Sequence, residues 1–368
     1  MKIQSVPLLQ GSVGTARELT SFHFGDTGGQ KIYIQASLHA DETPTMLVAL
    51  HLKRRLAEFE QRKAINAEIV LVPVANPIGL DQILLGQFVG RFDLETGRNF
   101  NRDFPELNYL AARKLLGTDA IENRKLIREA LNRELADIRP RSEFESLRLN
   151  LMRLSIDADV VLDLHCSLEA VMHLYANTAQ WEQVEPLARY LGAEAALLTT
   201  DSGGNSFDET HSLFWWNLKH GAERNKPIPD GCVAVTIECR GQRDVSYEQA
   251  EKDADAIINF LIWRGALIDE IPEMPALISP ATPLAGSEQF YAPVSGVLVH
   301  RAKLGALIKK GDALFDIVDP LTGQTNTVCS NTEGIFYMRR AIRFVHCGNP
   351  IGRVSGSVPI RAGKLIGL

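Results

Sequence analysis

The sequence has few cysteines, no long apolar run and no excess of basic residues, and each shortage excludes a class of protein. Its five cysteines form no CxxC pair, which is typical of free thiols in a reducing compartment. No stretch of about 18 consecutive apolar residues occurs, so we predict no membrane-spanning segment. The formal net charge of −6 argues against a nucleic-acid-binding surface, which needs clustered basic side chains. Met1 to Arg17 contains no apolar core of the signal-peptide type, so we expect a cytoplasmic protein.

The remaining composition is that of a folded globular chain. Hydrophobic residues make up 45% and charged residues 23% of the 368 positions, which predicts one or two domains with substantial cores. Composition leaves open whether the chain forms a homo-oligomer.

Short apolar segments alternate with helical patterns over most of the chain. Thr43–Lys63 begins with a Thr-Pro pair, a good N-cap and first helical position, and Tyr247–Gly265 has a second helical pattern. This alternation predicts an α/β fold with a mixed, mostly parallel central sheet flanked by helices. The predicted strands are Lys31–Leu38, Glu68–Val74, Asp159–His165, Ala170–Tyr175, Ala195–Thr200 and Cys232–Glu238.

Two regions depart from this rhythm and suggest the domain organisation. Residues 106–153 are rich in Arg and Glu with a helical period, which predicts a helical insertion, and we interpret its alternating charges as a solvated face. Four prolines between 271 and 286 indicate a linker. Short Gly-separated strand segments follow, typical of a small all-β, barrel-like domain. We therefore predict a main domain over residues 1–270 and a β domain over residues 286–368.

Four residues, His39, Glu42, His165 and Glu238, lie at the ends of predicted buried strands. Carboxyl ends of strands meet at one rim of an open sheet, so these side chains could converge there. Two imidazoles and one carboxylate match the ligands of a catalytic zinc ion, and a second carboxylate could move protons. Asp163, two residues before His165, could accept a hydrogen bond from a ligand imidazole. For each residue alone, a structural hydrogen-bonding role is the more common interpretation; the combination favours a metal site.

A second cluster lies in the loop over residues 91–105. It contains Arg91, Arg98, Asn101 and Arg102. An Asn–Arg pair suits a substrate carboxylate, and another arginine could stabilise an oxyanion. On composition alone, an ordinary surface loop with salt bridges is the simpler interpretation.

Several short motifs, in their order along the chain, resemble those of the zinc carboxypeptidase-like superfamily, and more closely those of its succinylglutamate desuccinylase/aspartoacylase family. The resemblance spans roughly residues 31–265. It is carried by His39-Ala40-Asp41-Glu42, Val74-Ala75-Asn76-Pro77, Asn99-Phe100-Asn101-Arg102, Asp163-Leu164-His165 and Thr236-Ile237-Glu238. Two features depart from the family pattern: the insertion is large, and Arg98-Asn99-Phe100 replaces the usual acidic residue before the Asn-Arg pair.

The resemblance implies a role for each candidate residue. His39, Glu42 and His165 would hold one Zn²⁺ ion, and Glu238 would be the general base and then the acid. Asn101 and Arg102 would bind a substrate carboxylate. Arg91 is the preferred candidate for polarising the scissile carbonyl, and Arg98 is its competitor.

The implied activity is hydrolysis of an N-acyl amino acid or related amide by metal-activated water. A zinc carboxypeptidase or peptide amidase acting on a short peptide is an alternative, and a non-catalytic metal- or ligand-binding protein is an alternative of another class. The segments Ala292–Leu298 and Gly305–Asp312 resemble biotinyl/lipoyl-type domains. Because residues 311–331 contain no lysine, we exclude a swinging-arm role.

Overall fold

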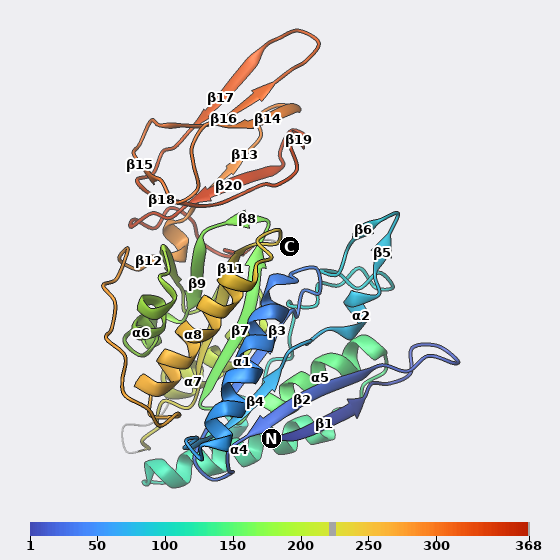
Figure 1. The fold of residues 1–368 in the computed structure, drawn as a ribbon, viewed down its shortest axis with the longest axis vertical. Coiled ribbons are helices and arrows are strands. Elements are labelled where there is room, and N and C mark those ends of the chain that lie inside the picture. The colour runs from blue at the N-terminus through green and yellow to red at the C-terminus, as the bar shows by residue number, and fades with distance from the viewer. Residues whose placement is uncertain (221–225, 367–368) are drawn as a thin grey trace.

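The computed structural model describes residues 1–220 and 226–366. Within them, a nine-stranded sheet forms the centre of the main part of the molecule (Figure 1). Strands β3, β4, β7 and β11 pair parallel, as do β9, β10 and β12, whereas β1, β2 and the β9–β11 pair are antiparallel. The fold is therefore the predicted mixed, mostly parallel α/β class. In spatial order the strands are β1 (Lys2–Pro7), β2 (Glu18–Phe24), β4 (Ala67–Val72), β3 (Gln30–Ala36), β7 (Val160–Ser167), β11 (Val233–Gly241), β9 (Met172–Ala176), β10 (Ala195–Leu198) and β12 (Thr282–Pro283).

Helices cover both faces of this sheet. Strands β3 and β7 are buried almost throughout, as expected for strands between two helical layers. One apolar core includes residues of α1 (Pro44–Gln61), α6 (Trp181–Leu191) and α8 (Tyr247–Trp263). A second core, on the opposite face, includes residues of α3 (Tyr109–Arg113), α4 (Ala120–Asp137), α5 (Glu143–Ser155) and α7 (Phe207–His220). The short elements are α2 (Pro77–Leu80), the hairpin of β5 (Ile83–Leu84) and β6 (Gln87–Phe88), and the 3₁₀ helices Thr178–Gln180 and Leu284–Gly286.

Helices α4 and α5 occupy the predicted insertion and begin at polar caps. Asp119 accepts a hydrogen bond from the Glu122 amide, and Ser142 accepts one from the Glu145 amide. The interpretation of this region as a solvated face is wrong for Arg148, which is buried. Its guanidinium lies over the Phe104 ring, which the sequence period of the helix alone does not reveal.

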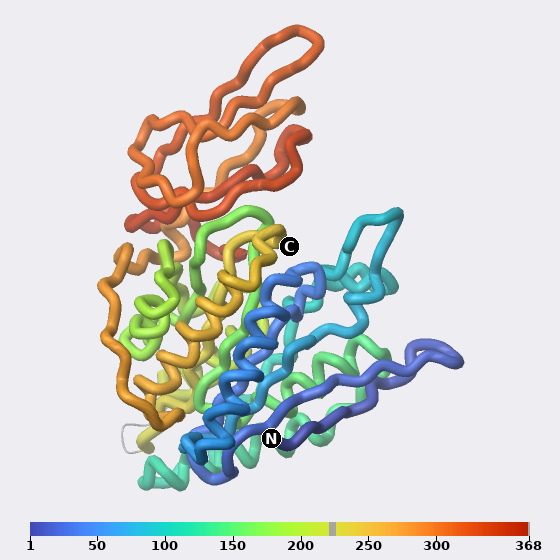
Figure 2. Tube along the Cα trace, in the orientation of Figure 1, coloured from blue at the N-terminus to red at the C-terminus, as the bar shows by residue number. Residues whose placement is uncertain are grey.

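The chain after the linker forms two further sheets, which we call the C-terminal sheets. They have their own apolar core and lie over one end of the main sheet (Figure 2). Strand β8 (Glu169–Ala170), directly after β7, pairs with β18 and joins the two parts. The strands are β13 (Glu288–Tyr291), β20 (Pro350–Val354), β18 (Gly334–Arg339) and β15 (Leu307–Ile308) in one sheet, and β17 (Thr325–Cys329), β16 (Ala313–Val318), β14 (Gly296–His300) and β19 (Phe344–Val345) in the other. The domain limits at 270 and 286 remain a prediction.

Two details differ from the sequence prediction. Pro44 is the first residue of α1, but Thr43 makes no side-chain capping bond because its own backbone is already helical. His165 and Glu238 do not end their strands. They form a register pair inside β7 and β11, which continue to a pairing of Ser167 with Gly241 beyond a register shift.

Each helix in the described part of the chain is too short or too polar to span a lipid bilayer.

Candidate active site

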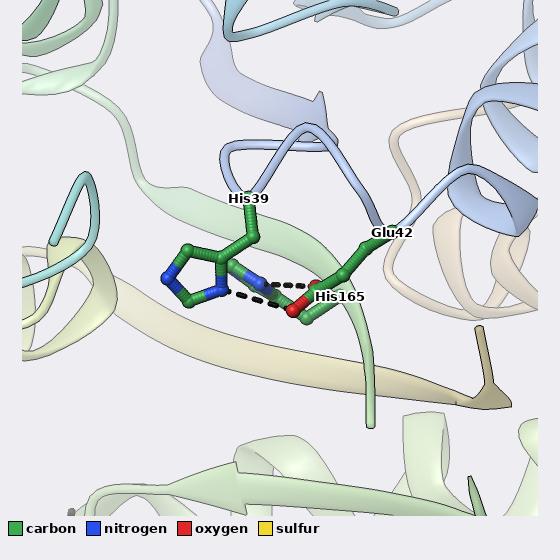
Figure 3. Close-up of side chains that lie close together, drawn as sticks. All are labelled: His39, Glu42 and His165. Carbon is green, nitrogen blue, oxygen red and sulfur yellow. Dashed lines mark hydrogen bonds and ion pairs between the residues drawn. The ribbon is translucent and has the colours of Figure 1, made fainter. Parts of the chain in front are cut away.

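Three of the predicted site residues meet at one edge of the main sheet. His39 and Glu42 lie in the loop between β3 and α1, and His165 lies on the neighbouring strand β7. His39 Nδ1 is 2.9 Å from Glu42 Oε1, and His165 Nδ1 is 2.8 Å from Glu42 Oε2 (Figure 3). One nitrogen or oxygen of each residue lies within 4.8 Å of the others, and all three side chains are buried.

The loop that carries His39 and Glu42 is folded tightly by polar side chains. Ser37 has a positive φ of 58°, which turns the chain out of β3. Its hydroxyl donates to the Glu42 carbonyl oxygen at 3.0 Å, and the Thr45 hydroxyl donates to the same oxygen at 2.8 Å. These bonds fix the backbone of Glu42 before α1 begins.

A glycine makes room for this loop. The Ala40 amide donates to the Gly90 carbonyl oxygen at 3.0 Å. A Cβ at Gly90 would lie 2.8 Å from both Ala40 Cβ and the Asp41 nitrogen. Any other residue at Gly90 would therefore push the metal-site loop away.

The outer nitrogen of His165 faces a chain of buried polar groups. His165 Nε2 is 2.9 Å from Asp163 Oδ2. Asp163 Oδ1 accepts from Gln35 Nε2 at 2.9 Å, and Gln35 Oε1 accepts from the Tyr33 hydroxyl at 2.9 Å. This is the position predicted for Asp163, and it leaves Nδ1 to face Glu42.

The outer nitrogen of His39 faces Asn99. Asn99 Oδ1 accepts from the Asn101 amide at 2.8 Å, so the atom facing that amide must be the oxygen. The same oxygen is 2.8 Å from His39 Nε2, which therefore carries the proton. Because a neutral imidazole has a single N–H, His39 Nδ1 presents a lone pair toward Glu42.

The donor set fits a divalent metal ion. All four ring nitrogens of His39 and His165 lie within 3 Å of an acceptor oxygen, and both Nδ1 atoms face the carboxylate of Glu42. Neutral imidazoles cannot satisfy this arrangement without a positive charge between them and Glu42. Two imidazole nitrogens and a carboxylate are the ligands of a catalytic zinc site with an open position.

The pKa shifts of Glu42, His165 and His39 are those expected at a site that binds a positive charge. Burial opposes ionisation of Glu42, but the charges and hydrogen bonds of His165 and His39 hold its pKa well below the usual range. Burial also opposes protonation of His165, yet the Asp163 and Glu42 carboxylates hold its pKa well above the usual value. Burial and then the Arg91 charge lower the pKa of His39 to about 4. A divalent metal ion bound here would supply positive charge between the two imidazoles and Glu42.

A cavity of about 510 Å³ lies against the cluster, and Glu238 lines it together with His39 and His165. Ser167 Oγ donates to Glu238 Oε2 at 3.2 Å, which orients the carboxylate. Burial and then the charge of Glu42 raise the pKa of Glu238 to about 7. The register shift just after Glu238 is a common feature of strands beside active sites.

Three residues of the predicted second cluster also line the cavity: Arg91, Asn101 and Arg102. Arg91 Nη1 donates to Glu42 Oε1 at 3.0 Å. Asn101 Oδ1 accepts from the Phe207 amide at 2.7 Å, and its Nδ2 is 3.2 Å from His165 Nε2. Arg98 is not among the residues of the described cavity wall, and its guanidinium lies 4.7 Å from the centre of the Phe144 ring.

Another buried histidine, His211, is not a member of the cluster of His39, Glu42 and His165. Its Nε2 is 2.8 Å from the Ser155 hydroxyl, and its Nδ1 is 2.7 Å from the Phe207 carbonyl oxygen. It therefore joins α7 to α5. Cys166 lines the cavity, but burial raises the pKa of its thiol, which disfavours a reactive thiolate.

Sequence reasoning gives no role to several residues that build the site. Asn99 and Gln35 are short-range neighbours of the predicted residues, but only the loop and strand geometry shows which way their side chains point. Part of the cavity wall also comes from the C-terminal sheets, including Met338 and Arg353. No local sequence signal connects these distant positions with His39.

Comparison with known proteins places this geometry among related structures. The family model of the succinylglutamate desuccinylase/aspartoacylase catalytic domain matches residues 28–264. A succinylglutamate desuccinylase/aspartoacylase family protein of known structure from Shewanella amazonensis is 26% identical, with a TM-score of 0.84 over 96% of this chain and 98% of that chain. No curated protein matches the chain.

More distant structures share the fold. A protein of the same description from Shewanella frigidimarina is 24% identical, with a TM-score of 0.85 over 96% of this chain and 97% of that chain. The product-bound ectoine utilization protein EutE from Ruegeria pomeroyi is 16% identical, with a TM-score of 0.68 over 96% and 95% of the two chains. The match therefore includes the C-terminal sheets as well as the main sheet.

Proposed function

The chain belongs to the succinylglutamate desuccinylase/aspartoacylase family, and on this basis we propose that it is a zinc-dependent amidohydrolase that removes the acyl group from an N-acyl amino acid or related amide. The observation that carries the proposal is the meeting of His39, Glu42 and His165 beside a cavity that Glu238 also lines. The family is named for hydrolytic reactions of this kind.

The proposed chemistry divides between the ion and the protein. When bound by His39, Glu42 and His165, a zinc ion lowers the pKa of water and polarises a carbonyl oxygen. Glu238 accepts a proton from the attacking water and later donates it to the leaving nitrogen of the amide. The Ser167 hydroxyl, which donates to Glu238 Oε2, holds the carboxylate in place for both transfers.

Arginines and an asparagine account for substrate orientation in this proposal. Arg91 lies beside Glu42 at the cavity surface, where its guanidinium can stabilise the oxyanion that forms from the scissile carbonyl. Arg102 and Asn101 face the same cavity and would hold the substrate carboxylate. We prefer Arg91 to Arg98 for the oxyanion because Arg98 stacks on Phe144.

The shape of the cavity favours a small substrate over a peptide. The C-terminal sheets supply part of its wall, including Gln289 and Ile351. A carboxypeptidase needs a groove that continues beyond the scissile bond, and we expect this wall to restrict such a groove. An N-acyl amino acid has no extended chain to accommodate.

The proposal is tested by zinc removal and a substrate panel. Chelated protein is expected to regain hydrolysis of N-acetyl or N-succinyl amino acids on addition of Zn²⁺, with dipeptides hydrolysed more slowly. Glu238→Gln should keep zinc but lose about 10²- to 10⁴-fold in kcat, the usual contribution of general acid–base catalysis. Glu248→Gln, at an exposed position of α8, is the matched control.

Three outcomes would contradict the proposal. A near wild-type rate for Glu238→Gln would remove Glu238 from the mechanism. Zinc well below one ion per chain, together with no hydrolysis of any panel member, would indicate the non-catalytic binding protein instead. Faster hydrolysis of dipeptides than of N-acyl amino acids would favour the carboxypeptidase.

A further inference from the structure

The hairpin of β5 and β6 exposes three consecutive apolar residues, Ile83, Leu84 and Leu85. The turn between the two strands is Leu85-Gly86, and both residues have a positive φ, 49° and 77°. Such a turn usually contains Asn, Asp or Gly, because a bulky side chain is strained there. Leu85 is nevertheless 95% exposed, at the tip of a hairpin that projects from the main part of the molecule (Figure 1). A strained apolar side chain held in solvent points to a function at this tip.

A second exposed apolar surface lies on the C-terminal sheet of β14, β16, β17 and β19. Val297 on β14 pairs with Phe344 on β19 and with Val318 on β16, so the three side chains form a row on one face of the sheet. Phe344 is 52% exposed, and Val297 and its same-face neighbour Val299 are exposed as well. The outer face of a sheet that packs on a core is normally polar, as at Thr325 on β17. We call Phe344, Val297 and Val318 the apolar row.

The two surfaces belong to parts of the chain with opposite charge. Residues 286–368, which include the C-terminal sheets, contain 10 Lys and Arg against 5 Asp and Glu, a formal charge of +5. Residues 1–285 contain 29 Lys and Arg against 40 Asp and Glu, a formal charge of −11. The hairpin therefore lies in the negative part of the molecule, and the apolar row lies in the positive part.

A second copy of the chain offers each surface a complementary partner. Exposed apolar surface of this kind marks sites of interaction between proteins. Contact between two hairpins, or between two apolar rows, would bring like charges together, whereas contact between a hairpin and a row brings opposite charges together. Surfaces in contact lie within the Debye length of about 8 Å at physiological salt, so this difference survives screening. Charge therefore favours the contact between unlike surfaces.

We propose that the β5–β6 hairpin of one copy docks on the apolar row of a second copy, so that the chain associates with itself through unlike surfaces. The hairpin supplies Ile83, Leu84 and Leu85 as apolar anchors, and the row supplies Phe344 and Val297. A contact between unlike surfaces closes into a dimer when it is made twice around a two-fold axis, and otherwise continues into a ring or a filament. This association does not depend on the proposed hydrolysis.

Sedimentation equilibrium of the full chain measures the association. At about 100 μM protein, the wild type is expected to have a mass that is a multiple of 40.7 kDa, the mass of one chain. Leu85→Asp and Phe344→Asp each place a carboxylate in the apolar contact, so each should weaken the association at least about 100-fold. Ile121→Asp, at an exposed apolar position of α4, is the matched control and should associate as the wild type does.

A mixture of the two variants distinguishes contact between unlike surfaces from contact between like surfaces. Leu85→Asp keeps its apolar row, and Phe344→Asp keeps its hairpin. One complete contact can therefore form between the two variants, and the mixture should regain a species of two chains that neither variant forms alone. Leu84→Asp and Val297→Asp, also at exposed positions, replace either variant if it does not fold.

A wild type with the mass of a single chain at this concentration would overturn the inference. Undiminished association of Leu85→Asp alone would indicate contact between two apolar rows, and that of Phe344→Asp alone would indicate contact between two hairpins; either result overturns the contact between unlike surfaces. A mixture that stays monomeric overturns it as well. If the wild type is monomeric but sediments with vesicles of phosphatidylcholine and phosphatidylserine, and Leu85→Asp does not, the hairpin binds a lipid surface instead.

Discussion

Asn99 determines which nitrogen of His39 faces Glu42 and the proposed metal position. Its Oδ1 is fixed by the Asn101 amide and accepts the Nε2 proton of His39, so the Nδ1 lone pair points to Glu42. Asp163 faces the Nε2 atom of His165 in the same way. In the proposed metal site, one imidazole therefore has a side-chain amide as its outer partner and the other a carboxylate.

At the residue scale, we predict that Asn99→Ala weakens zinc binding by about 10- to 100-fold, the usual effect of removing an outer partner of a ligand histidine. The physical reason is that His39 loses the acceptor that selects its tautomer. Competition with a chromogenic chelator measures the affinity without any need for activity. Asn132→Ala, at an exposed position of α4, is the control, and an affinity equal to wild type in Asn99→Ala would refute the role.

Helix α5 supports the loop that carries the proposed substrate-binding residues Asn101 and Arg102. Arg148 Nη2 donates to the Arg102 carbonyl oxygen at 2.7 Å. Its guanidinium lies 4.1 Å from the centre of the Phe104 ring and 5.0 Å from that of Phe144. The helical insertion thus acts on the site through the backbone of the loop that carries Asn101 and Arg102.

At the element scale, we predict that Arg148→Met raises KM for N-acyl amino acids by about 10-fold, in keeping with the loss of one hydrogen bond from a charged group. Zinc content should remain unchanged, because Arg148 touches no proposed ligand. Lysine at this position should not restore KM, since it lacks the planar group that stacks on the two rings. Arg141→Met, an exposed position just before α5, is the control; an unchanged KM in Arg148→Met would contradict the prediction.

At the scale of the whole molecule, buried histidines link stability to pH. Burial lowers the pKa of His211 to about 4, below its ordinary value of 6.5. Between these two pH values the unfolded chain binds a proton that the folded chain does not, so stability falls as the pH falls. Neutral His211, bonded to Ser155 and the Phe207 carbonyl oxygen, is the form that joins α7 to α5.

We therefore predict that His211→Gln reduces the pH dependence of stability. Between pH 7.5 and pH 5.0, the free energy of unfolding of the metal-free wild type should fall by about 2 kcal/mol more than that of the variant. Urea denaturation at the two pH values, in the presence of a chelator, measures this difference. His220→Gln, at the exposed end of α7, is the control, and equal losses in wild type and His211→Gln would contradict the prediction.

The sequence predicts the α/β class because buried strands and amphipathic helices have distinct periods. The strand edge on which His39 and His165 meet also follows from the sequence, since parallel strands end on the same side of a sheet. Side-chain direction in loops is not predictable in this way, so Asn99 has no role before the structure is seen. Arg148 has the charge of a surface residue, and only packing against Phe104 shows that it is buried. Arg353 reaches the cavity through the docking of the C-terminal sheets, which depends on contacts between distant segments.

The whole molecule places the proposed metal ligands of the main sheet and an arginine of the C-terminal sheets around one cavity. Metal binding by His39, Glu42 and His165 is the step on which the proposed activity depends. The most direct measurement is the zinc content of wild type, His39→Ala, His165→Ala and the exposed control His346→Ala. We predict one zinc ion per chain in wild type and His346→Ala, and little or none in the other two variants. Full zinc in His39→Ala or His165→Ala would contradict the site.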